Sequence, residues 1–183
     1  MLSVNVGEMK SITKEEVLQL IGHVTVFYAT LDVFVATLCH SLIPYGSVDR
    51  RRLRGAMTLG QRAKLLGELD SESVTNPDAL REFQSRLPEI IELSEIRNRF
   101  IHDQWNFNQE NLARGEIVSL RFEFGRDGGL LTENTHYTAA TMRALLKRVG
   151  EAQGIVTAAL AMVSSNQVPI RRDQPPETPN KSR

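Results

Sequence analysis

The sequence predicts an all-α fold, a bundle of four or five helices with a β-hairpin inserted before the last helix. Long segments repeat apolar residues at three- and four-residue spacing, which is typical of helices that bury one face. One later segment instead alternates apolar and polar residues and runs into a glycine-rich turn, which is typical of a hairpin. Because a single hairpin is not a stable sheet domain, we expect it to extend from a helical body.

The elements can be placed in order along the chain. Thr13 and Glu16 form a capping-box pattern, so a long helix is expected from Thr13 to about Ile43, where Pro44 ends it. Asn76 followed by a proline is a helix start, and Pro88 either kinks the helix that follows or divides it in two. The remaining expected elements are a helix over about Leu59–Leu69, a hairpin over about 117–137 and a final helix over Thr138–Ser165.

Length and charge limit the domain organisation and the class of partner. The chain has 183 residues, which favours one helical domain over 13–165, preceded by a lead over 1–12. The polar, proline-rich segment 166–183 is expected to be a disordered tail. The 22 basic residues equal the 22 acidic ones, so an anionic partner would have to be held by a local patch of positive charge.

Cysteine usage and hydropathy predict a cytoplasmic protein without a membrane partner. The single cysteine, Cys39, lies in an apolar run and is expected to be buried, and one cysteine cannot form a disulfide within the chain. The segment Met1–Val6 is short and charged residues soon follow it, unlike a secretory signal. The apolar segment Val17–Ile43 contains many polar residues, which a membrane-spanning helix rarely tolerates.

The candidate site is the hexapeptide Arg-Asn-Arg-Phe-Ile-His from Arg97 to His102, which follows a strongly apolar helical run. Arginine carries a permanent charge and a fork of donors suited to phosphate. Histidine exchanges a proton near neutral pH. Arg97 and His102 are therefore suited to cleaving a phosphodiester bond without a metal ion or another cofactor.

The spacing of these residues raises a geometric question. Asn98 and His102 are four residues apart and share a helix face, where the amide can orient the imidazole or hold the substrate. Arg97 and His102 are five residues apart, which places them about 140° apart around an ideal helix. Three arrangements would bring them together: a long Arg97 side chain that wraps around the helix, a frayed helix end, or a two-fold dimer with one motif on each side of a cleft.

The apolar helix before the motif, the spacing of arginine and histidine, and the polar residue after the arginine resemble the HEPN superfamily. The superfamily's arginine, polar residue and histidine fall on Arg97, Asn98 and His102, and Trp105 also looks like many members in this region. The resemblance is residue-specific over Arg97–Trp105 and architectural over about 13–165. It implies a homodimer with a composite site and metal-independent endoribonuclease activity, often in toxin–antitoxin or defence systems with an antitoxin or regulatory protein as partner.

Three further features could contact RNA. The densest positive patch consists of Arg50, Arg51, Arg52 and Arg54. This patch can bind along an RNA backbone. Alternatively, it is a solvated loop whose charge is partly neutralised by Asp49. Arg99, within the motif, is another cation. The ring of Trp105 can stack on an unpaired base or close the core.

Less specific interpretations remain beside the ribonuclease hypothesis. The domain can be a non-catalytic HEPN-like module that binds a protein, a nucleotide or RNA. In a purely structural protein, Arg97 would form ion pairs with Glu92, Glu95 or Asp103, and His102 would cap the helix end. Asp103 beside His102 also looks like the pair of metal-dependent phosphohydrolases, but no further histidine or carboxylate cluster supports a metal site. We expect structural or solvent-facing roles for the other histidines, His23, His40 and His136.

Overall fold

The computed structural model describes residues 11–53, 57–124 and 129–165, which are mostly helical with a small three-stranded antiparallel sheet. The predicted helical body and its late hairpin are thereby confirmed, whereas residues 1–10 of the expected lead over 1–12 and the expected tail over 166–183 lie outside the described residues. The helices are α1 (Lys14–Leu42), α2 (Val48–Arg52), α3 (Leu59–Glu68), α4 (Pro77–Ser85), α5 (Leu87–His102), α6 (Gln109–Ala113) and α7 (Ala139–Ser165), with a 3₁₀ turn over Ser71–Ser73. The strands are β1 (Gln104–Asn106), β2 (Glu116–Phe124) and β3 (Leu130–Thr138).

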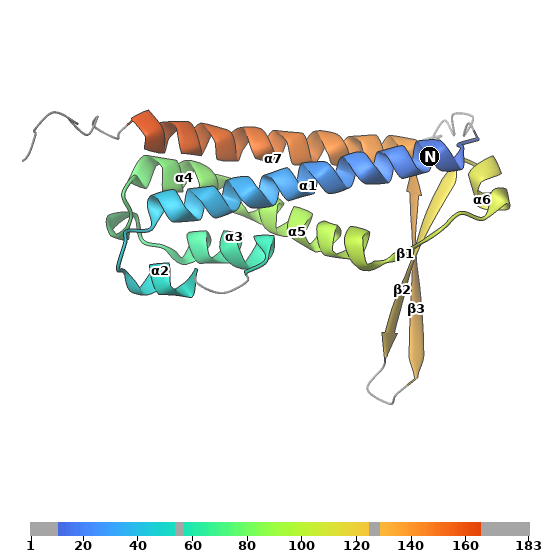
Figure 1. The fold of residues 1–183 in the computed structure, drawn as a ribbon, viewed down its shortest axis with the longest axis horizontal. Helices are drawn as coiled ribbons and strands as arrows, with labels where there is room; N and C mark the ends of the chain where they lie inside the picture. The colour runs from blue at the N-terminus through green and yellow to red at the C-terminus, as the bar shows by residue number, and fades with distance from the viewer. Residues whose placement is uncertain (1–10, 54–56, 125–128, 166–183) are drawn as a thin grey trace, which may run out of the picture.

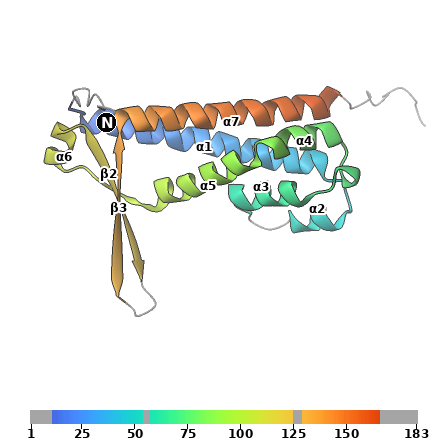
Figure 2. The same cartoon turned by 180° about the vertical axis from the view of Figure 1, so that it is seen from behind.

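The two longest helices, α1 and α7, lie side by side and run in the same direction, and α3, α4 and α5 cover them from one side (Figures 1 and 2). The predicted capping box starts α1: the Thr13 hydroxyl accepts from the Glu16 amide, and the Glu16 carboxylate accepts from the Thr13 amide. Pro88 coincides with a break, since α4 ends at Ser85 and α5 begins at Leu87, so the proline divides the segment.

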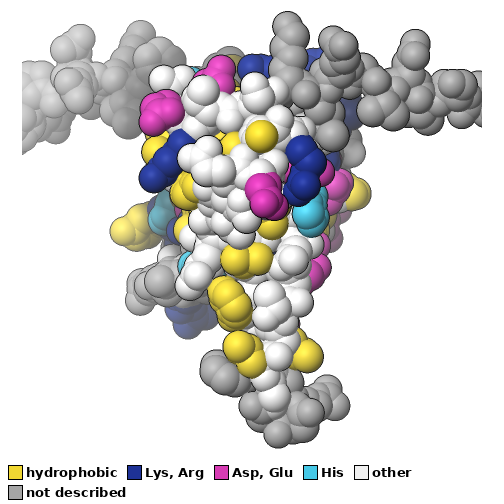
Figure 3. All heavy atoms as spheres, turned by 90° about the vertical axis from the view of Figure 1, so that its right-hand side faces the viewer, with side chains coloured by type: hydrophobic (Ala, Val, Ile, Leu, Met, Phe, Trp, Pro, Cys, Tyr) yellow, Lys and Arg dark blue, Asp and Glu magenta, His cyan; other side chains and the backbone are white. Residues whose placement is uncertain are grey.

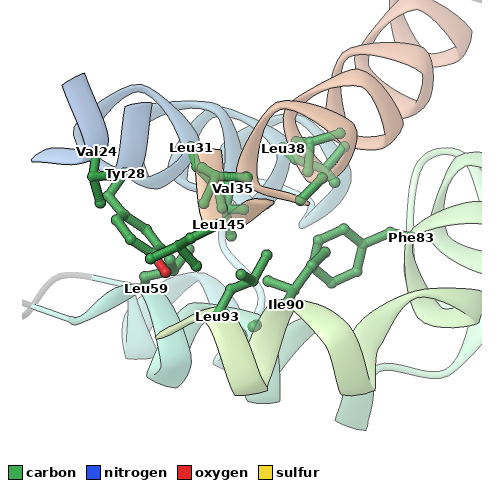
Figure 4. Close-up of a cluster of buried hydrophobic side chains, with 14 of the residues drawn as sticks. Val24, Tyr28, Leu31, Val35, Leu38, Leu59, Phe83, Ile90, Leu93 and Leu145 are labelled. Carbon is green, nitrogen blue, oxygen red and sulfur yellow. The ribbon is translucent and has the colours of Figure 1, made fainter. Parts of the chain in front are cut away.

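The core forms where α1 and α7 meet α3, α4 and α5. Tyr28 and Leu31 of α1, Leu93 of α5 and Leu145 of α7 belong to this buried cluster (Figure 4). Cys39 is fully buried, as predicted, and burial raises the pKa of its thiol to about 12. The thiol is therefore protonated at neutral pH and behaves as a small apolar side chain.

By length and composition alone, α1 could also cross a membrane, a property shared by core helices of soluble proteins and by signal sequences. One face of α1 packs into the bundle, with Val17, Val24 and Leu31 fully shielded from solvent. The other face exposes Val26 and Val33.

The sheet follows α5 directly and contains one strand that the sequence pattern did not predict. Its order is β1-β2-β3, with Trp105 of β1 opposite Ser119 of β2. Strand β1 has three residues, too few for an alternating pattern to be recognised. Beyond it, β2 and β3 continue as a two-stranded ribbon that projects from the bundle (Figure 1) and carries exposed hydrophobic side chains, among them Phe122, Leu130 and Leu131 (Figure 3).

Candidate functional site

Helix α5 carries the motif and is continuous to its last residue. The Asp103 amide donates to the Arg99 carbonyl at 2.8 Å and closes the final turn, so the helix does not fray before His102. At about 100° per residue, Arg97, Ile101, Asn98 and His102 follow one another around the helix over about 140°. Arg97 and Asn98 are half-buried, whereas Ile101 and His102 are exposed. These four residues form one solvent-facing strip, called the α5 strip below.

The guanidinium of Arg97 is turned toward Asn98. Its Nη1 donates to Asn98 Oδ1 at 3.1 Å. Because Asn98 shares a helix face with His102, this bond draws the positive charge toward the histidine side of the strip. Within the described residues no hydrogen bond or ion pair joins Arg97 to His102 itself, so the three arrangements that would bring them together stay predictions.

The ion pairs expected for a purely structural Arg97 do not form. Glu92 is bound by Arg148, whose Nη1 and Nη2 donate to it at 3.2 and 2.8 Å. Asp103 accepts a hydrogen bond from Ser119, and within the described ranges Arg97 pairs with no carboxylate. The remaining N–H donors of its guanidinium are therefore available to a ligand.

The opposite side of α5 fixes the strip to the sheet. Arg99 Nη2 donates to both carboxylate oxygens of Glu133 in β3, at 3.0 and 2.9 Å. The buried Phe100 ring meets Trp105 edge-on, with centroids 4.6 Å apart, and Tyr137 at 6.1 Å. These contacts place the end of α5 on a packed aromatic cluster, so the α5 strip has a rigid support.

Asp103 belongs to this inner side and not to the strip. Its side chain is buried, and its Oδ2 accepts from the Ser119 hydroxyl at 3.1 Å. Asp103 lies about 100° around the helix from the exposed His102. The two side chains therefore do not form one metal-ligating face, which disfavours the phosphohydrolase interpretation.

The arginine-rich segment forms the short helix α2, which has no buried residue but is bonded to its neighbours. Arg50 Nη1 donates to the His40 carbonyl at 2.5 Å and to the Ile43 carbonyl at 3.4 Å, at the end of α1. Arg52 pairs with Asp49 at 3.2 Å and with Glu68 at 2.8 Å. Arg51 is exposed and has no partner in the described part of the chain, and Arg54 lies outside the described residues. Two of the four arginines in this patch therefore join α1, α2 and α3.

The other candidates fall mainly into structural positions. Trp105 is half-buried and lies between Phe100 and Tyr137, consistent with the expected role in closing the core. His23 and His136 are exposed, on α1 and β3. His40 is exposed in the last turn of α1, and partial burial together with nearby arginines lowers its pKa.

One residue of the strip was missed by sequence reasoning. Ile101 is 40% exposed and lies between Arg97 and Asn98 around the helix. The signal was present in the sequence, since an isoleucine four residues after Arg97 must share its polar side of the helix.

The strip combines three chemical functions on one surface. Arg97 can neutralise charge on a phosphate, the amide of Asn98 holds that guanidinium, and the imidazole of His102 can exchange a proton. Comparison of the chain with protein-family models, with curated proteins and with solved structures finds no match in any of the three.

Proposed function

We propose that this chain is a HEPN-superfamily endoribonuclease of the cytoplasm that cleaves RNA without a metal ion, as a homodimer in a toxin or defence system. The observation that carries the proposal is the α5 strip. Arg97, Asn98 and His102 occupy one continuous solvent-facing surface of a packed helix, and among the described residues the guanidinium is bonded only to a neutral amide. Arg97 therefore keeps an uncompensated charge, which an anionic substrate can use.

The chemistry follows from these groups. His102 removes the proton from a ribose 2′-OH, and the resulting oxygen attacks the adjacent phosphorus. The new bond joins phosphorus to O2′, and the bond to O5′ breaks. Arg97 stabilises the negative charge on the phosphoryl oxygens, and a protonated histidine returns a proton to O5′. The products are a 2′,3′-cyclic phosphate and a 5′-hydroxyl, and DNA, which lacks the 2′-OH, is not cleaved.

A dimer supplies what one chain lacks. The reaction uses a base and an acid, and a single strip presents one histidine. A two-fold axis through the strip would place His102 of a second copy across the cleft. Ile101, 40% exposed in the middle of the strip, gives the two copies an apolar contact at the axis.

Cleavage of a single-stranded RNA oligonucleotide tests the proposal. We expect Arg97→Ala and His102→Ala each to lower the cleavage rate by at least about 100-fold, while circular dichroism and thermal melting stay unchanged because both side chains face solvent. Arg143→Ala and His136→Ala are matched controls, since both residues are exposed on other elements, α7 and β3. Cleavage that survives both strip variants, or that EDTA abolishes, contradicts the mechanism.

The dimer is tested separately through Ile101. We expect Ile101→Glu to shift sedimentation from dimer to monomer and to abolish cleavage, because like charges would face each other at the axis. Val26→Glu, on the exposed side of α1, is the control. An active Ile101→Glu monomer would contradict the composite site.

The second candidate is a non-catalytic HEPN-like module that binds a protein partner, a nucleotide or RNA. It is favoured by the zero net charge and by the internal partners of Arg50, Arg52 and Arg99, which leave few cations to hold a long RNA. Binding of RNA or nucleotide without turnover, unchanged in His102→Ala, would support this candidate. A growth defect caused by the wild type and absent in His102→Ala would contradict it.

A further inference from the structure

A cavity of about 370 Å³ lies between α5, β3 and α7. This volume is within the range of sites that hold small organic molecules. Its walls are largely apolar, formed by Ile96 of α5, Ala144 and Leu145 of α7, and the ring of Tyr137 of β3. Ile96 lies on the opposite side of α5 from the strip, so the cavity is separate from the proposed ribonuclease site.

Two arginines reach this cavity from different elements, Arg99 from α5 and Arg148 from α7. Each is held by a glutamate that does not line the cavity: Glu133 binds Arg99, and Glu92 binds Arg148 through two nitrogens. The glutamates are the more exposed partners, at 54% and 58% against 40% and 36% for the arginines. The carboxylates therefore fix the positions of the two arginine side chains that line the cavity.

The donors of Arg99 are only partly used. Both of its hydrogen bonds to Glu133 come from Nη2. Nε and Nη1 have no partner among the described residues, so they can bind an anion without breaking the ion pair.

A buried hydroxyl near the cavity also has no partner. Tyr28 is 1% exposed, and its Oη makes no hydrogen bond within the described ranges. Arg148 and Tyr137, which line the cavity, both affect the pKa of Tyr28 and so lie close to it, and burial keeps the hydroxyl neutral. The Tyr28 ring reaches from α1 into the buried cluster that contains Leu145 (Figure 4).

We propose that this cavity binds a small organic anion with an apolar body and a single carboxylate. The body fills the space between Ile96, Leu145 and the Tyr137 ring, and the carboxylate is held by Arg99 and Arg148. The proposal does not depend on the ribonuclease activity, because none of these residues belongs to the α5 strip.

The chain contains its own reporter for this site. Trp105 is the only tryptophan, and its ring lies 5.6 Å from that of Tyr137, measured between centroids. A molecule that packs against Tyr137 should therefore change the tryptophan emission. Isothermal titration calorimetry provides a second, independent measure of affinity.

Three probes of the same shape test the charge requirement: 4-phenylbutanoate, 4-phenylbutan-1-ol and 4-phenylbutylamine. We expect the carboxylate to bind at least about tenfold more tightly than the alcohol, and the amine to bind more weakly than both. Equal affinities for the three probes, or no binding of the carboxylate by calorimetry, would overturn the proposal.

Two variants test the location, with thermal melting used to verify folding. Ala144→Phe fills the cavity and should abolish binding of 4-phenylbutanoate, whereas Ala161→Phe, exposed elsewhere on α7, should not. Arg148→Gln should weaken the carboxylate at least about tenfold and leave the alcohol unchanged, and Arg143→Gln is its control. Binding that Ala144→Phe leaves intact would place the probe elsewhere and refute the site.

Discussion

Two arginine-bearing segments look alike in the sequence and differ in the fold. In α2, Arg50 is bonded to carbonyl oxygens at the end of α1, and Arg52 is bonded to two carboxylates. In α5, the one side-chain partner of Arg97 within the described ranges is the amide of Asn98. The α2 segment has more cations, but of its described arginines only Arg51 lacks a partner among the described residues, whereas in α5 it is Arg97 that lacks a carboxylate partner there. The number of arginines therefore indicates a site less well than the acceptors that the fold brings to each one.

The same contrast exists within α5 itself. Arg97 and Arg99 are two residues apart, which places them about 160° apart around the helix. Arg99 faces the sheet and pairs with Glu133, whereas Arg97 faces away and meets no carboxylate in the described part of the chain. Two arginines only two residues apart thus differ in role: Arg99 forms an ion pair with the sheet, whereas Arg97 has no carboxylate partner among the described residues.

Of the variants that compare the two segments, Arg97→Lys has the largest expected effect. Lysine keeps the charge but lacks the planar fork, so it cannot hold Asn98 and two phosphoryl oxygens together. If the chain is a ribonuclease, we expect single-turnover cleavage to slow by about 10- to 100-fold, less than in Arg97→Ala. Arg143→Lys, on the exposed surface of α7, should leave the cleavage rate unchanged. Full activity in Arg97→Lys would mean that only charge matters at this position.

The next effect is on stability and concerns Arg50. Arg50→Gln removes charge-assisted hydrogen bonds to the end of α1, and we expect urea denaturation to show a loss of about 1.5–3 kcal/mol in the free energy of unfolding. Arg51→Gln, one residue away and without a partner in the described ranges, should change it by less than about 0.5 kcal/mol. Equal effects of the two variants would contradict a structural role for Arg50.

Much of the fold was predictable because its signals are local. The capping box at Thr13, the proline at position 88 and the alternation of β2 act within a few residues, and each marks the expected boundary or break. Strand β1 was not predictable, since its three residues become a strand only by pairing with β2.

The candidate site was likewise predictable from the sequence only where its features depend on residues close together in the chain. The shared face of Asn98 and His102 follows from helix geometry, and so does the position of Ile101. The partners of Arg50, Arg52 and Arg99 do not, because Glu133 lies 34 residues from Arg99 and Glu68 lies 16 residues from Arg52. Contacts between distant residues depend on how the helices pack, and neither composition nor spacing specifies that packing.

A smaller effect is expected for the pair of Arg99 and Glu133. Both side chains are partly exposed, at 40% and 54%, so solvent screens their attraction. A double-mutant cycle with Arg99→Gln and Glu133→Gln should give a coupling energy below about 1 kcal/mol. A coupling of several kcal/mol would show that this ion pair, more than the aromatic cluster around Phe100, holds the end of α5 on the sheet.

The smallest effect concerns the pKa of His40, and it reports directly on the charge of Arg50. Partial burial lowers this pKa from its ordinary value of 6.5, and the positive charges of Arg50 and Arg62 lower it further. The folded state therefore takes up the proton less readily than the unfolded state. The contribution of neutral His40 to the free energy of unfolding is therefore fully present above pH 6.5. It declines as the pH falls below this value. An NMR titration of the His40 imidazole, assigned with His40→Gln, should show its pKa rising in Arg50→Gln and unchanged in Arg51→Gln. An identical His40 titration in wild type and Arg50→Gln would mean that the charge of Arg50 has no effect on the pKa of His40. Burial and Arg62 alone would then set this pKa.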